Sequence, residues 1–285
     1  MTEITSELGP ATAPGITSDV TRAVAAQYDE FQTSLEQVGM AREFLNYGFR
    51  TPGAQTYEQM QQQLCLEVFK AAGISATDNI VDVGFGTGAQ SLLLYESHEF
   101  ASYTGFNIAA KQVEFAARRA AARNLSAKLK FEHGEAESLP GISNSSIDKL
   151  MAIECAFYFD RPRFYRRAAE VLRPGGRAII ADIALSNSMS FLLRSREDFS
   201  RIGTTSGNRR EWEKYFKTKS VRDINPWTRP GVQRSVFEIL RISGFAKITA
   251  AQRLEWFKMA FYSQLVAIGQ ILGLIRYEMI VLERR

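Results

Sequence analysis

The chain has 285 residues, 45% of them hydrophobic, and a formal net charge of +4. This length and apolar content suit one large globular domain or a domain with an added subdomain. Its 35 basic and 31 acidic residues form no long single-sign block, which argues against nucleic acid as a partner. Cys65 and Cys155 lack metal-ligand spacing, so we expect no metal site and a reducing, cytoplasmic setting.

The two ends of the chain differ in composition, and neither pattern is typical of a targeting signal or a membrane span. Residues 1–18 are rich in Thr, Pro, Gly and Ser, and we expect them to be mobile because they offer little apolar surface. Glu3 and Glu7 stand where a signal peptide needs basic residues, so we expect no export signal. The apolar stretch 256–275 is interrupted by polar residues such as Lys258, which predicts a helix packed on protein and no membrane span.

Two helices are predicted before residue 73. The first covers residues 20–37, capped by Asp19 or Thr21, and the second covers residues 57–72. From residue 79 onward, short apolar runs alternate with amphipathic segments such as 109–123. This alternation predicts an α/β fold with a parallel sheet covered by helices on both faces. The predicted strands are 80–83, 102–106, 128–131, 149–153, 177–181, 247–250 and 279–282.

The alternation breaks between residues 186 and 240, where Arg, Asn, Trp and Pro interrupt it. We predict an inserted cap there that contacts the substrate. The expected organisation has five parts, in chain order. They are a mobile N-terminus (1–18), a helical lid (19–72), the main α/β core (73–185), the cap (186–240) and C-terminal strands that complete the core (241–285).

The stretch VDVGFGTG, residues 81–88, ends the first predicted strand with three glycines. In an open parallel sheet, ligands bind beyond the carboxyl ends of the strands. Gly84 and Gly86 permit positive φ or close approach of a ligand, and Gly88 lets the next helix begin tight against the sheet. Such a turn alone also fits other nucleotide cofactors or a plain tight turn. Asp82 narrows the choice, because a carboxylate repels a pyrophosphate and suits a ligand with a cationic amine.

VDVGFGTG resembles motif I of class I S-adenosylmethionine-dependent methyltransferases. Four later stretches resemble the other motifs of that family in the proper order, namely YTGFNIAAKQV, GEAESLP, IECAFYFD and LRPGG. The resemblance covers most of the chain. It implies a Rossmann-like, seven-stranded methyltransferase sheet with helices on both faces and a helical cap. It also implies S-adenosylmethionine as the cofactor, with S-adenosylhomocysteine as its product.

The resemblance implies where the cofactor binds. Asn107 stands where the family usually has an acidic residue for the ribose hydroxyls, and its amide can still donate and accept. Glu135 and Ala136 would flank the adenine, with Glu135 accepting from the exocyclic amine. Tyr47 would lie over the cofactor in a lid. The implied cofactor residues are Tyr47, Asp82, Gly84, Gly86, Gly88, Gln90, Asn107, Ile108, Gln112, Glu135, Ala136 and Glu154.

A narrower similarity concerns LNYGFRTPGAQTYEQ, upstream of motif I, and ECAFYFD after the fourth predicted strand. Both look like the branch that methylates small natural products, including macrolide sugars, glycolipids and terpenoid precursors. We therefore expect a small-molecule acceptor and favour O-methylation of a hydroxyl. We also expect a homo-oligomer formed through the N-terminal helices. The expected acceptor contacts are Tyr28, Phe49, Phe157, Tyr158, Trp212 and Tyr215.

Methyl transfer is an in-line displacement, so the protein contributes mainly positioning and exclusion of water. Relatives of this branch often carry a histidine where this chain has Tyr158. Glu154 and Tyr158 are the candidates for proton removal, although a neutral phenol is a poor base near neutral pH.

Two alternatives to O-methylation remain open. One is C-methylation of a prenyl acceptor, whose carbocation aromatic faces would stabilise. Arginines of the cap would then bind a diphosphate on that acceptor; they are Arg194, Arg196, Arg201, Arg209 and Arg210. The other is a protein of the same fold that binds S-adenosylmethionine without transferring its methyl group.

Overall fold

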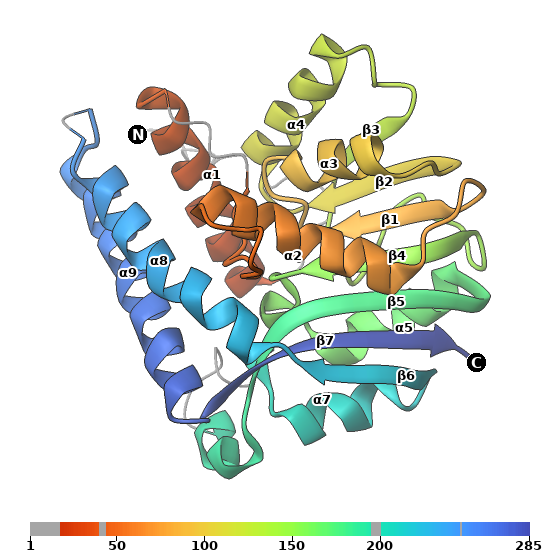
Figure 1. The fold of residues 1–285 in the computed structure, drawn as a ribbon. Coiled ribbons are helices and arrows are strands. Elements are labelled where there is room, and N and C mark those ends of the chain that lie inside the picture. Colours follow the sequence, from red (N-terminus) through yellow and green to blue (C-terminus); the bar gives the residue numbers. More distant parts are fainter. Residues whose placement is uncertain (1–17, 40–43, 195–200, 246) are drawn as a thin grey trace, which may run out of the picture.

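The computed structural model describes residues 18–39, 44–194, 201–245 and 247–285, and residues 1–17 of the expected mobile N-terminus lie outside these ranges. Within the described chain, seven strands form one sheet in the order β3-β2-β1-β4-β5-β7-β6 (Figure 1). This confirms the seven-stranded Rossmann-like sheet. The strands are β1 (Asn79–Val83), β2 (Ser102–Asn107), β3 (Leu129–His133), β4 (Ile147–Ile153), β5 (Leu172–Leu185), β6 (Phe216–Asp223) and β7 (Ile275–Arg284).

Strand direction places a ligand crevice at one edge of this sheet. β1 pairs in parallel with β2 on one side and with β4 on the other. The chain order therefore reverses between β1 and β4, and ligands bind beyond the carboxyl ends of strands at such a switch point. β7 runs antiparallel between β5 and β6.

Helices cover the sheet and one of its ends. In chain order they are α1 (Asp19–Gln37), α2 (Tyr57–Ala72), α3 (Ala89–Ser97), α4 (Ala110–Ala122), α5 (Arg161–Val171), α7 (Thr205–Trp212), α8 (Asn225–Ser243) and α9 (Ala250–Ile271). In the part of the chain that the structure describes, 3₁₀ segments cover η1 (Ala156–Tyr158) and η2 (Asn187–Arg194). The prediction for residues 57–72 is confirmed, since Thr56 forms a capping box that starts α2.

Alternating side chains of the central strands enter two separate cores. Met151 and Ile179 point into one core with α2 and α3, whereas Leu150 and Ile180 point into the other with α5. Two-sided burial explains why these strands are continuous apolar runs. The predicted helical cover on both faces is thus confirmed.

Part of the predicted cap belongs to the main body. β6 lies at the sheet edge beside β7, and α7 packs on α5 (Figure 1). In β6 only Phe216 is buried, so this edge strand shows no apolar alternation and its polar sequence was misread as cap. The predicted strand at 247–250 is also wrong, because a capping box between Thr249 and Gln252 starts α9 there.

The helical cap itself is built from α1, α8 and α9. A compact apolar cluster joins them, with Phe31 and Leu35 from α1, Ile239 and Ile242 from α8, and Trp256 from α9. Figure 1 shows these helices beside one end of the sheet, while α2 lies along its face. Of the expected lid at 19–72, α1 and the segment 44–47 reach the ligand edge, whereas most of α2 packs along the sheet. Among the described helices, α9 included, none is long and apolar enough to cross a bilayer.

Candidate active site

The glycine turn after β1 has the backbone that its sequence predicts. Gly84 and Gly86 have φ of +70° and +60°, where L side chains are strained. A Cβ at Gly84 would lie 2.6 Å from the Cys155 Cβ, and one at Gly86 would lie 3.3 Å from the Leu45 Cδ1. The two glycines thus keep open a cavity between this turn, the turn after β4 and the segment before α2.

Gly88 and Asp82 support this loop from beneath and do not line the cavity. A Cβ at Gly88 would lie 2.7 Å from the Ala116 Cβ of α4 and 3.6 Å from the Phe131 ring of β3, so this glycine lets α3 begin close to both α4 and the sheet. Asp82 Oδ2 accepts hydrogen bonds from Gln90 Nε2 and from Tyr103 Oη, each at 2.8 Å. Burial raises the pKa of Asp82 to about 7, and these two hydrogen bonds oppose that rise. Asp82 therefore acts through Gln90, which does reach the cavity.

The first cavity lies over the carboxyl ends of β1, β2 and β4, and residues from four of the five resembling motifs meet around it. Eight of the expected cofactor residues line it, namely Gly84, Gly86, Gln90, Asn107, Ile108, Gln112, Ala136 and Glu154. Several residues that the motifs do not indicate also line it, among them Thr21, Val24, Phe44, Leu45, Asn46, Glu137 and Phe159. Because α1 reaches this site only through tertiary packing, no local motif marked Thr21 or Val24.

Two further expected cofactor residues lie elsewhere. Glu135 is buried and is not among the lining residues, whereas Glu137, two positions on, lines the cavity. Glu137 Oε1 accepts the backbone N–H of Asp160 at 2.8 Å, and burial raises its pKa. Tyr47 borders a second cavity instead of the first.

A pair of carboxamides lies at the end of β2. Asn107 Nδ2 donates to Gln112 Oε1 at 2.9 Å, and Asn107 Oδ1 accepts from the backbone N–H of Ala109 at 3.1 Å. Both amides line the first cavity. This pair offers donors and acceptors at the position where the resemblance puts the ribose hydroxyls.

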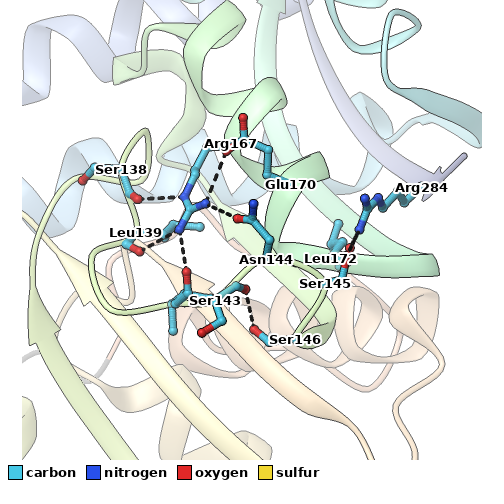
Figure 2. Close-up of polar contacts among 11 residues, drawn as sticks. Ser138, Leu139, Ser143, Asn144, Ser145, Ser146, Arg167, Glu170, Leu172 and Arg284 are labelled. Carbon is cyan, nitrogen blue, oxygen red and sulfur yellow. Dashed lines mark hydrogen bonds and ion pairs between the residues drawn. The ribbon is translucent and has the colours of Figure 1, made fainter.

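Arg167 holds the loop that follows the Ala136–Glu137 wall. Its guanidinium donates to the carbonyl oxygens of Ser138 (2.8 Å), Leu139 (3.4 Å) and Ile142 (2.6 Å). It also donates to Asn144 Oδ1 at 2.8 Å, and Figure 2 shows the guanidinium at the centre of this loop. At the other end of the same loop, Arg284 donates to Ser145 Oγ and to the Leu172 carbonyl.

The second cavity has a volume of about 550 Å³ and lies among α1, α8, α9 and the end of β5. Apolar side chains such as Phe31, Ile239 and Val266 make most of its wall. Residues that line both cavities mark where the two meet; they are Val24, Tyr28, Leu45, Gln112, Glu154 and Tyr158. The structure therefore brings both candidate catalytic residues to the junction between two cavities.

Three of the expected acceptor contacts line the second cavity, namely Tyr28, Phe157 and Tyr158. The other three do not. Phe49 is buried and stacks on Trp227, with ring centroids 5.6 Å apart. Trp212 is buried in the core beside α5, where its indole donates to Thr218 Oγ1 at 2.9 Å, and Tyr215 packs on the same core. Trp212 and Tyr215 lie away from the second cavity because residues 205–223 belong to the main body and not to a cap.

Glu154 is held in an unusual backbone conformation, with φ of +53°. Its Oε1 accepts from the Tyr47 backbone N–H at 2.7 Å and from Tyr277 Oη at 2.5 Å. Burial raises the pKa of Glu154 to about 8, and the two hydrogen bonds counteract part of the rise. This carboxyl is thus suited to exchange a proton near neutral pH.

Tyr158 is suited to a different role. Burial raises its pKa well above the ordinary value and that of Tyr28 to about 12. Both phenols therefore stay protonated at neutral pH, and of the two catalytic candidates only Glu154 can take up a proton there. Tyr158 instead offers a ring face and a hydroxyl donor at the junction.

A buried ion pair supports the turn that carries Tyr158. Asp182, at the end of β5, accepts from the backbone N–H of Ile183 at 2.8 Å and from those of Ala156 and Phe157. Arg161 lies 3.5 Å from Asp182 and donates to the Arg201 carbonyl. These contacts fix η1 against β5.

Arg201 is the described cap arginine that lines the second cavity, where it donates to the Tyr158 carbonyl at 2.7 Å. Arg209 pairs with Glu213 on the exposed side of α7, and Arg210 lies on the same helix. Arg196 and the side chain of Arg194 lie outside the described part. In the described chain no group of His, Cys, Asp and Glu is arranged to hold a metal ion.

These features place the protein in the class of Rossmann-like α/β proteins that have a glycine-bordered cavity where the strand order reverses, between β1 and β4. Residues 80–176 match the family model described as a methyltransferase domain. Erythromycin 3''-O-methyltransferase of Saccharopolyspora erythraea is 36% identical over 49% of this chain, but over only 46% of its own length. The 27-O-demethylrifamycin SV methyltransferase of Amycolatopsis mediterranei is 28% identical over 83% of this chain and 90% of its own.

Comparison with solved structures shows a similar fold. The [4+2]-cyclase SpnF is similar with a TM-score of 0.78 and 20% identity, over 95% of this chain and 98% of SpnF. The chain belongs to the S-adenosylmethionine-dependent methyltransferases, in agreement with the resemblance of its motifs.

The residues of the first cavity fit that cofactor. Asn46 lines the cavity and is buried, yet its Oδ1 has no hydrogen-bond partner in the described chain. Buried acceptors without a partner are uncommon and suit a ligand that carries donors, such as an ammonium group. As the motif resemblance implies, the glycines would leave room for the amino-acid end, and Asn107 with Gln112 would offer amides to the ribose.

Proposed function

We propose that this protein transfers the methyl group of S-adenosylmethionine to a hydroxyl of an apolar small natural product. The observation that carries this proposal is the junction of the two cavities, with Glu154 in the wall of both. One cavity fits the cofactor, the other is large and mostly apolar, and a carboxyl with a pKa of about 8 stands between them.

In this reaction bound S-adenosylmethionine supplies an electrophilic methyl carbon. The acceptor oxygen forms a bond to that carbon while the sulfur–carbon bond breaks, and the hydroxyl proton passes to Glu154. S-adenosylhomocysteine leaves with a neutral sulfur, so charge and atoms balance. Tyr277 and the Tyr47 backbone hold Glu154 in place. The apolar walls from α1, α8 and α9 exclude water from the junction.

The acceptor class follows from the second cavity. A volume of about 550 Å³ suits a drug-sized compound, and a wall of Phe, Ile, Val and Met selects an apolar one. The two relatives described above are named for methylation in the erythromycin and rifamycin series, which agrees with a large natural product. A cytoplasmic location belongs to the same proposal, supported by the free thiols of Cys65 and Cys155.

C-methylation of a prenyl acceptor is the second candidate. The rings of Tyr28, Phe157 and Tyr158 border the junction, where they would stabilise a carbocation. Arg201 lines the same cavity, where its guanidinium would bind an anionic group of the acceptor. This reaction needs no base before attack; a base is needed only afterwards, when the carbocation loses a proton to re-form an alkene, and Glu154 at the junction would accept that proton.

One experiment separates these candidates. The purified protein is incubated with methyl-labelled S-adenosylmethionine and a panel of macrolides, phenols and prenyl diphosphates, and the products are analysed by mass spectrometry. A label on a macrolide or phenol oxygen is the expected result, and a label on a prenyl carbon would select the second candidate. Calorimetry with S-adenosylmethionine runs in parallel. Tight binding without transfer to any compound would instead indicate a non-methylating role, as the activity named for SpnF illustrates for this fold.

A further inference from the structure

The outer face of α9 carries large apolar side chains along its whole length. They lie at spacings of three and four residues, which place them on one side of the helix. Six of them are between 43 and 63% exposed, namely Leu254, Phe257, Phe261, Leu265, Ile268 and Leu272. The opposite side of α9, including Trp256, Ala260 and Ser263, is buried in the cap. An apolar face of this size on a soluble domain marks an interaction site.

The charges of this face indicate the kind of partner. The exposed polar residues within it are Lys258 and Gln264, and Lys258 pairs with Glu255 at 2.6 Å. Helices that lie on anionic membranes carry rows of Lys and Arg beside the apolar face. Because α9 lacks such a row, a protein surface of the same apolar character fits it better than a lipid headgroup layer.

The six side chains are also arranged so that the face complements itself. In an antiparallel pair of identical helices centred near Ser263, Leu254 faces Leu272 of the other copy and Phe261 faces Leu265. Large apolar groups therefore meet large apolar groups at both ends and in the middle. A two-fold interface requires this self-complementarity.

We propose that two copies of this chain associate through the outer faces of α9, packed antiparallel about a two-fold axis. At roughly 200 Å² for a large apolar side chain, six half-exposed side chains contribute about 600 Å² per copy. Standard interfaces bury about 800 Å² per partner, so modest contacts from flanking residues complete the area. This location differs from the N-terminal helices expected from the sequence, of which α2 packs on the sheet and α1 on the other cap helices.

Association would also complete the wall of the second cavity. Tyr262 and Leu265 line that cavity and are themselves about half exposed. A second copy of α9 would cover them from outside and exclude water there. This consequence rests on the proposed function, whereas the interface itself does not.

Light scattering coupled to size-exclusion chromatography tests the interface on the full chain. We expect the wild type at micromolar concentration to have about twice the monomer mass of 32.0 kDa. Phe261→Glu should give a monomer with an unchanged circular dichroism spectrum. The matched control is Tyr95→Glu, which also charges an exposed aromatic residue but on α3, and it should stay dimeric. A monomeric wild type, or a dimeric Phe261→Glu variant, overturns the proposal. If a monomeric wild type floats with vesicles of zwitterionic lipid, the face binds lipid.

Cross-linking tests the antiparallel arrangement. A variant with both Leu254→Cys and Leu272→Cys should form a covalent dimer with a short bis-maleimide, because the two positions face each other across the pair. Each single variant should not, since identical positions lie at opposite ends. Cross-linking of the single variants would show a parallel pair and contradict the proposed geometry. The native Cys65 and Cys155 are buried, and the wild type is the control for their reactivity.

Discussion

The phenol oxygens of Tyr28 and Tyr158 lie 3.1 Å apart, although 130 residues separate the two in the chain. Their rings meet edge to face, with centroids 5.9 Å apart and planes at 85°. Tyr28 belongs to α1 and Tyr158 to η1 after β4. This contact ties the cap helix to the turn that carries the catalytic candidates, so the position of α1 and the shape of the junction change together.

Replacing Tyr158 distinguishes its ring from its hydroxyl. Tyr158→Phe removes one hydrogen bond between neutral groups, worth about 1 kcal/mol, so turnover should fall by less than about tenfold. Tyr158→Ala removes the wall of both cavities and should lower turnover by about 100-fold or more, because a misplaced acceptor reacts slowly. Steady-state kinetics on both variants measures this. A Phe variant as slow as the Ala variant would show that the hydroxyl takes part directly.

Glu154→Gln should lower turnover by roughly 10²–10⁴-fold, the usual effect of losing a general base. The carboxamide oxygen can still accept from the Tyr47 N–H and the Tyr277 hydroxyl, so the fold and the cofactor affinity should stay near those of the wild type. Kinetics together with calorimetry of S-adenosylhomocysteine measures both effects. An unchanged turnover with a hydroxyl acceptor would remove Glu154 from the reaction.

The pH profile gives an independent check on the same carboxyl. A base works when it is deprotonated, so wild-type turnover should rise with pH and level off above about pH 8, the raised pKa of Glu154. The Tyr277 hydroxyl lowers that pKa by stabilising the carboxylate. Tyr277→Phe should therefore move the rise to higher pH. A flat profile between about pH 6 and pH 9 would show that proton removal by Glu154 does not limit the rate, as expected for a reaction that needs no base before attack.

The glycine turn makes a steric prediction with an internal control. Gly86→Val should weaken cofactor binding at least tenfold, because its side chain would occupy the wall of the first cavity beside Leu45. The backbone strain of a side chain at φ of +60°, about 1–2 kcal/mol, lowers the stability of the fold. Gly73→Val has the same φ at the end of α2, where a Cβ meets only Arg177 Nη1 at 3.5 Å. That variant should lose thermal stability but keep its cofactor affinity. Calorimetry and thermal unfolding separate the two effects, and equal affinity losses would refute the assignment of the turn.

The two arginines of Figure 2 offer another matched pair. Arg167→Ala should loosen the loop after Ala136 and Glu137, because it removes the donor to three backbone carbonyls. We expect weaker cofactor binding and faster amide exchange over residues 138–144. Arg284→Ala affects the far end of the same loop and should leave the affinity unchanged. Hydrogen exchange and calorimetry with S-adenosylmethionine test this. Equal cofactor affinity in the two variants would show that Arg167 contributes only to the stability of the loop.

Local motifs allowed much of the cofactor cavity to be predicted from the sequence. Gly84, Gly86 and Gln90 belong to one turn and the helix after it, and Asn107 with Gln112 belongs to the next. Each follows a strand whose apolar run is evident, so their meeting at one sheet edge follows from the parallel order of the strands. The α2 helix was equally clear because its capping box and its apolar face lie in adjacent residues.

The acceptor side could not be predicted in this way, because tertiary packing determines it. Trp212 is expected from the sequence to line a pocket, but β6 belongs to the sheet and α7 packs on the core, so Trp212 is buried there. The edge strand β6 has one buried residue, so the period of two that reveals a strand is missing. The role of α9 in the second cavity was equally hidden, since its inner and outer faces are both largely apolar.

The antiparallel insertion of β7 has a consequence for how the protein is synthesised. Ile180 of β5 pairs with Ile280 of β7, so β5 cannot pair along this edge until about a hundred more residues have been synthesised. Until then the ribosome-bound chain exposes an unpaired edge of β5, and such edges invite aggregation. Tyr277 arrives on the same late strand, and with it the hydroxyl that stabilises the Glu154 carboxylate. The residues of the glycine turn are therefore synthesised before the strand that supplies the Tyr277 hydroxyl to Glu154. Ribosome stalling between residues 185 and 275 would leave a chain that can form the glycine turn but lacks this hydrogen bond at the junction of the two cavities.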